Sequence, residues 1–171
     1  MSAGRQILRE SFAVIERELG PHSLPPWAFA VVRRMIHASA DFDFARTLRY
    51  SPGFADAIRA ALRGSSPVIT DTEMVLLGIR TALGDLPSAC YLNDPETPGL
   101  AAGAGLTRSA AGIRLAARRH SAPVLAIGNA PTALDEALRL VDEEGWRPAA
   151  VVGIPVGFVG VEEAKQRLLA Q

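Results

Sequence analysis

The chain has 171 residues, of which 49% are hydrophobic, 21% charged and 6% aromatic. This composition predicts one globular domain over residues 1–171 and excludes disordered and collagen-like chains. Cys90 is the only cysteine, which excludes intrachain disulfides and multi-cysteine zinc sites. The 18 basic residues balance the 18 acidic ones, and no apolar run is long enough for a membrane span. We therefore expect no nucleic-acid partner, no membrane and a cytoplasmic location.

The first part of the sequence predicts helices, because apolar residues recur there every three or four positions. These helices are expected over residues 6–19, 27–37 and 53–62. Gly20 ends the first, and Pro26 is well placed to open the second. Ser51 is typical of an N-cap for the third, which Gly64 ends.

Four short apolar runs follow, each bounded by Pro, Gly, Asn or Asp, and they predict fully buried strands. The strands are expected over residues 67–70, 89–92, 124–127 and 149–152. Segments with helical periodicity alternate with them, at residues 73–83, 107–120, 132–144 and 161–169. Alternating strands and helices predict an α/β fold: a doubly wound, mostly parallel sheet with helices on both faces, preceded by a helical N-terminal part.

The loops that leave the carboxyl ends of such strands share one edge of the sheet, where ligands bind. Here these loops cover residues 70–74, 93–96, 128–132 and 153–158. They are rich in polar residues, Gly or Pro, whereas the strands before them are apolar. The sequence therefore predicts a ligand site at this edge.

Several common chemistries find no support in the sequence. The glycines at 103 and 105 lack a third glycine and do not follow the first strand, so no nicotinamide site is implied. There is no Walker A lysine and no G-x-S-x-G motif. The histidines, at 22, 37 and 120, lack the spacing of a metal site on one element. We expect no metal site.

Seven short phrases occur in a fixed order between residues 11 and 160. They are SFA at 11–13, RMIHA at 34–38, DTEMV at 71–75, LNDP at 92–95, TRSAA at 107–111, IGNAPTAL at 127–134 and GIPVGFVG at 153–160. Together they resemble the precorrin-8X methylmutase family, called cobalt-precorrin-8 methylmutase in the anaerobic branch of cobalamin biosynthesis. Each phrase alone is weak, but seven in order are specific.

The resemblance implies a homodimeric isomerase with a Rossmann-like fold and no organic cofactor. Its substrate is a corrinoid macrocycle, in which a methyl group moves from C-11 to C-12 by a 1,5-sigmatropic shift. The product is hydrogenobyrinic acid, or cobyrinic acid when the ring holds cobalt. Two phrases, at 41–45 and 68–72, look more like the cobalt branch, while residues 73–74 look more like the cobalt-free one.

The family pattern normally continues beyond the helix at Lys165 into a further strand and a Gly/Arg-rich loop, which this sequence lacks. We therefore expect a single methylmutase-like domain without them. This departure keeps a second function open, that of a corrinoid-binding or carrier protein that does not isomerise its ligand.

The resemblance places the family's general acid at His37. Imidazoles exchange protons near neutral pH, and protonating the conjugated ring would ease migration of the methyl group. The alternative is a histidine that merely complements the dipole at the end of its helix. Asp41 and Asp43 could orient the imidazole, although a solvated turn is the commoner meaning of such a run.

The resemblance also implies a set of substrate-binding residues: Ser11, Thr72, Arg108, Ser109, Asn129 and Thr132. Arg108 and Ser109 open a helix after a Gly-rich turn, where a guanidinium and backbone amides can meet a substrate carboxylate. The alternative is an ordinary helix-start arginine beside a capping serine. Capping is likewise the default explanation for Asn129 and Thr132, which flank Pro131, and Thr72 is equally ambiguous.

Overall fold

The computed structural model describes residues 3–171 and divides into two compact units, one ending at Tyr50 and the other covering Ser51–Gln171. The N-terminal unit contains the helices α1 (Ala3–Leu19), α2 (Pro26–Ser39) and α3 (Phe44–Thr47). Gly20, with φ +67°, ends α1 in the left-handed region that glycine adopts at little cost. The predicted helical N-terminal part is confirmed.

A small apolar core holds the N-terminal unit together. Ile15 of α1 is buried against Val32 and Ile36 of α2. Phe12 and Phe44 pack at its margin. The four-residue α3 was not predicted, because one turn is too short to show helical periodicity.

The C-terminal unit is built on a four-stranded sheet in which all described neighbours are parallel. Its strands are β1 (Val68–Thr70), β2 (Ser88–Cys90), β3 (Val124–Ile127) and β4 (Ala150–Gly153), in the order β2-β1-β3-β4. Thr70 pairs in register with Cys90 on one side and with Ala126 on the other. The carboxyl ends of the strands therefore lie side by side, and the predicted parallel pairing is confirmed.

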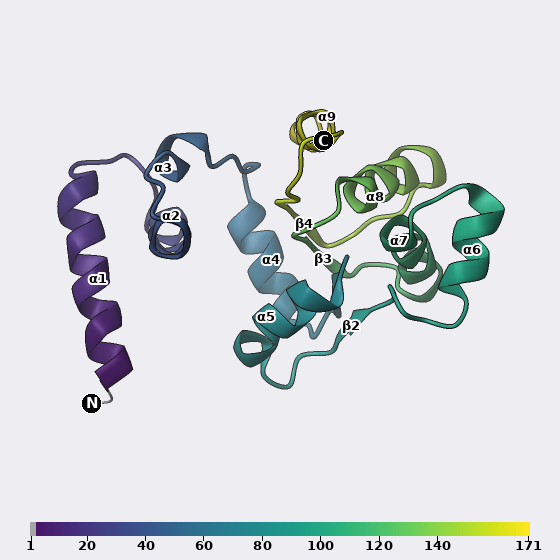
Figure 1. Ribbon diagram of the computed structural model, residues 1–171, viewed down its shortest axis with the longest axis horizontal. Helices are drawn as coiled ribbons and strands as arrows, with labels where there is room; N and C mark the ends of the chain where they lie inside the picture. The colour runs from purple at the N-terminus through teal and green to yellow at the C-terminus, as the bar shows by residue number, and fades with distance from the viewer. Residues whose placement is uncertain (1–2) are drawn as a thin grey trace. The chain divides into compact units, whose positions relative to one another are not determined.

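Helices cover both faces of this sheet (Figure 1). Val68, Val124 and Ala150 point to one face, where α4 (Phe54–Arg63) and α5 (Glu73–Leu83) pack. Ile69, Leu125 and Ile127 point to the other, where α7 (Arg108–Arg119), α8 (Pro131–Glu144) and α9 (Val161–Leu169) pack. Because side chains alternate along a strand, burial on both faces explains why β1 and β3 are apolar runs. The prediction of full burial was wrong for β2, where Ser88 is exposed, and for β4, which is mostly half-buried. The predicted doubly wound α/β fold is confirmed.

The local predictions were wrong at three places in this unit. The N-cap of α4 is Gly53, at φ +80°, rather than Ser51. Helix α6 (Thr97–Ala104) was not predicted, because its mostly small residues show no separate polar and apolar faces. Strand β2 ends at Cys90 rather than Leu92, because the Tyr91 carbonyl accepts from the Thr97 hydroxyl at 2.6 Å.

Gly112 allows α7 to approach the chain after β2 closely. A Cβ at this position would lie 3.1 Å from the backbone carbon of Tyr91 and 3.3 Å from the Leu92 nitrogen. Backbone cannot move aside as a side chain can, so Gly112→Ala should lower the free energy of unfolding by about 1–2 kcal/mol in urea titrations. Gly78 in α5 has open space at its Cβ position, so Gly78→Ala should instead stabilise by up to about 1 kcal/mol. Equal effects in the two variants would contradict this account.

Candidate active site

The strands are added in opposite directions on the two sides of the β1–β3 pair. The chain passes from β1 outward to β2 on one side, and from β3 outward to β4 on the other. The helix that follows β1 packs on one face and the helix that follows β3 packs on the other. The two exit loops therefore diverge, and in open α/β sheets ligands bind at such a switch point. The loops here contain Asp71 and Thr72 after β1, and residues 128–130 after β3. This edge is where the sequence predicted a ligand site.

Asp71 joins the two loops. Its side chain is 2% exposed, and its carboxylate accepts hydrogen bonds from the backbone amides of Gly128, Asn129 and Ala130 at 3.1, 2.8 and 2.6 Å. An acidic residue directly after a buried strand was the available sequence signal, but nothing local showed where its partners lie. The role of Asp71 was therefore missed.

Thr72 and Asn129 lie on the two loops that Asp71 joins. Thr72 is the N-cap of α5, where its hydroxyl accepts from the Val75 amide at 3.5 Å. Asn129 is half-buried, and its carbonyl accepts from the Val156 amide at 3.3 Å. The N-cap of α8 is Ala130, so the capping interpretation of Asn129 is wrong.

Thr132 is the second residue of α8, and its side chain contacts the residue that precedes α7. Its hydroxyl is 2.8 Å from that of Thr107, which also caps α7 by accepting from the Ala110 amide at 3.2 Å. Thr132 is therefore not a helix cap either. The two threonines line a cavity of about 370 Å³ together with Arg139, and neither Thr72 nor Asn129 is among the residues lining it.

Arg108 and Ser109 occupy the first turn of α7, at the same edge of the sheet. A terminal nitrogen of Arg108 donates to the Asn93 side-chain oxygen at 2.6 Å and to the Leu92 carbonyl at 3.1 Å. Arg108 thereby ties α7 to the loop after β2 while its side chain stays exposed. Ser109 is half-buried, and because Thr107 is the cap, the capping interpretation of Ser109 is wrong.

His37 and Ser11 belong to the N-terminal unit. His37 is exposed in the last turn of α2 and lies edge-on to the Phe12 ring, with centroids 5.6 Å apart and planes at 83°. The Ser11 hydroxyl donates to the Ile7 carbonyl at 2.8 Å. Asp41 accepts from the Asp43 amide at 2.8 Å, which confirms the solvated turn.

The loop between β4 and α9 exposes apolar side chains at the carboxyl edge. Ile154, Val156, Phe158 and Val159 are 52%, 62%, 105% and 88% exposed. The loop is attached to the β3 exit, because the Ile154 amide donates to the Ile127 carbonyl at 2.9 Å. We call residues 154–159 the apolar loop. Exposed apolar clusters of this kind mark places where a ligand or partner binds.

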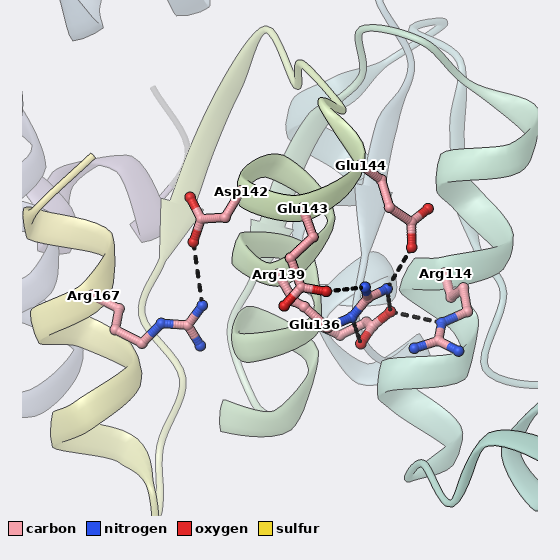
Figure 2. A network of polar contacts seen from close by, with 7 residues as sticks. All are labelled: Arg114, Glu136, Arg139, Asp142, Glu143, Glu144 and Arg167. Carbon is pink, nitrogen blue, oxygen red and sulfur yellow. Dashed lines mark hydrogen bonds and ion pairs between the residues drawn. The ribbon is translucent and has the colours of Figure 1, made fainter.

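A buried ion-pair network holds α7 against α8 (Figure 2). Glu136 is 4% exposed and accepts from Arg114 Nε at 2.7 Å and from Arg139 Nη2 at 2.9 Å. Burial acts to raise the pKa of Glu136, but the hydrogen bonds from Arg139 and Arg114 outweigh it and hold that pKa below its usual range. The pKa of Arg139 is raised by its carboxylate partners, Glu136 first.

Within residues 3–171, no helix is both long and apolar enough to cross a membrane. Over the same residues, no cluster of three or more His, Cys, Asp or Glu side chains could hold a metal ion.

Comparison with known proteins relates nearly all of the described chain to one group of enzymes. The family model for precorrin-8X methylmutase matches residues 6–171. A precorrin-8X methylmutase of Sinorhizobium sp is 41% identical, with 96% of this chain and 80% of the relative aligned. A cobalt-precorrin-8 methylmutase of Leptospira interrogans is 37% identical, over 97% of this chain and 78% of the relative.

A solved structure of the Thermus thermophilus precorrin-8X methylmutase is similar to the fold described above. It aligns with a TM-score of 0.85 at 36% identity, covering 97% of this chain and 82% of the other.

Proposed function

Because the chain belongs to the precorrin-8X methylmutase family, we propose that it isomerises a corrinoid of cobalamin biosynthesis by moving a methyl group from C-11 to C-12 of the macrocycle. The observation that carries this proposal is the match of the family model to residues 6–171. Substrate and product are isomers, so one carbon–methyl bond breaks and another forms without a co-reactant.

The carboxyl edge of the sheet suits a ligand of this chemistry. A corrinoid has a broad apolar ring and carboxylates around its periphery. The apolar loop offers exposed hydrophobic surface, and Arg108 offers a guanidinium at the same edge. We assign substrate binding to Ser11, Thr72, Arg108, Ser109, Asn129 and Thr132. Proton donation to the ring is assigned to His37.

The experiment that tests this function is a conversion assay followed by visible absorption. Precorrin-8X and cobalt-precorrin-8 are incubated separately with the purified chain. Methyl migration changes the conjugation of the macrocycle, so a catalyst shifts the spectrum and yields hydrogenobyrinic or cobyrinic acid. A carrier protein would return both substrates unchanged, and that result would contradict the proposal.

We further propose that the chain acts in the cytoplasm, as its single cysteine suggests, and as a homodimer, as the family resemblance implies. Sedimentation velocity at micromolar protein should then give the mass of two chains, twice 18.1 kDa. Sedimentation as a monomer alone across the concentration range of the activity assay would contradict the dimer.

A further inference from the structure

The backbone of the β3–α8 loop depends on one acidic side chain from a neighbouring strand. Three backbone amides, those of Gly128, Asn129 and Ala130, converge on Asp71. A carboxylate suits this place because it only accepts hydrogen bonds and offers two oxygens with about four lone-pair positions. An asparagine would present an amino group, which cannot accept, to at least one of these amides.

Other contacts support the same loop from two further directions. The Val156 amide of the apolar loop donates to the Asn129 carbonyl. A Cβ on Gly128 would lie 2.9 Å from Val75 Cγ2, so the loop rests directly on α5. Asp71 therefore links β1 to a loop that also contacts α5 and the apolar loop.

Asp71 also occupies amides that could otherwise bind an anion. Free amides at a helix N-terminus attract phosphates and carboxylates. Here the protein's own carboxylate takes the amides that lead into α8, and it is 2% exposed. A carboxylate of the ligand must therefore be met by side chains such as Arg108 rather than by these amides.

We propose that Asp71 is a positioning residue that holds the β3–α8 loop, with Asn129 and Thr132, in its substrate-binding arrangement before the ligand arrives. This inference rests on the proposed function. Asp71 acts through the loop, so its loss should affect the binding of the macrocycle more than the chemical step.

The test compares Asp71→Asn with Trp146→Phe in the full chain. Both variants remove hydrogen bonding from a buried side chain, but Trp146 follows the C-terminal end of α8, where its indole nitrogen donates to the His120 carbonyl at 2.8 Å rather than contacting the loop amides. In Asp71→Asn, hydrogen exchange should accelerate selectively at the amides of Gly128, Asn129 and Ala130. KM for the corrinoid should rise about tenfold, and kcat should stay within about threefold. Trp146→Phe should lose stability with KM unchanged.

Two results would overturn the inference. One is an unchanged KM in Asp71→Asn. The other is an equal rise of KM in Trp146→Phe, because KM would then follow stability alone. If Asp71→Asn fails to fold, Asp71→Glu replaces it: its longer side chain displaces the same loop, so KM should rise and an unchanged KM again overturns the inference.

Failure of the proposed function is separable from failure of this inference. If the unmodified chain converts neither corrinoid, the proposed function is wrong. Titration with hydrogenobyrinic acid then decides the role of Asp71. A Kd about tenfold weaker in Asp71→Asn supports positioning, whereas equal values, or no binding by either protein, overturn it.

Discussion

The His37→Ala variant should bind the corrinoid almost as tightly as the unmodified chain and yet lose about two to four decades of turnover. A general acid acts in the transition state, whereas on the assignment proposed above the macrocycle would be held by apolar contact and by other side chains. The exposed imidazole, packed edge-on against Phe12, is free to meet a ligand. Single-turnover conversion with saturating substrate, followed in the visible spectrum, measures the loss.

His22→Ala is the matched control, since His22 is an exposed histidine of the same unit that stacks on Phe29 with centroids 4.2 Å apart. Turnover of His37→Ala at the control's rate would make His37 a structural residue.

Glu136→Gln should lower the free energy of unfolding by about 3 kcal/mol at pH 7, because it leaves two partly buried guanidinium groups facing a neutral side chain. Arg114 and Arg139 are 23% and 27% exposed, and Arg139 keeps Glu143 and Glu144 as partners (Figure 2). Because Arg139 keeps these two partners, we expect the loss of stability to lie at the low end of the range for broken buried ion pairs. Urea titration monitored by circular dichroism measures it.

Asp142→Asn is the control on the same helix. Its ion pair with Arg167 spans 3.4 Å between side chains that are both 44% exposed, so its loss should cost less than about 1 kcal/mol.

The effect of Glu136→Gln on stability should also depend on pH. Because the folded-state pKa of Glu136 is lowered, its contribution is complete above the ordinary carboxyl pKa and is lost as pH falls through the lowered one. A difference between Glu136→Gln and the unmodified chain that persists in strong acid would contradict this origin.

The local sequence was sufficient to predict a helix or strand where residues within that element mark its type or its ends. Pro26 and Gly64 mark helix ends through backbone geometry, and the apolar run at Val124–Ile127 is buried on both faces. These features depend on residues within one or two turns of one another. The doubly wound fold followed from them, because alternating buried strands and helices leave few other arrangements.

The sequence predicted that the candidate site lies at the carboxyl edge of the sheet, but it did not predict the contacts within the site. Thr72, Arg108, Asn129 and Thr132 were expected after successive strands or at helix starts, and the structure places each there. Ser109 was expected to share the start of α7 and does so.

Tertiary structure decided the roles that depend on partners far along the chain. Asp71 bonds amides 57 to 59 positions away, and Glu136 bonds Arg114 from 22 positions away. No local pattern identifies the partners of these acids, because the groups that bond to them come close only when β1 meets β3 and α7 meets α8. Element type and order are thus determined by short-range periodicity and backbone preference, while buried polar contacts are determined by packing.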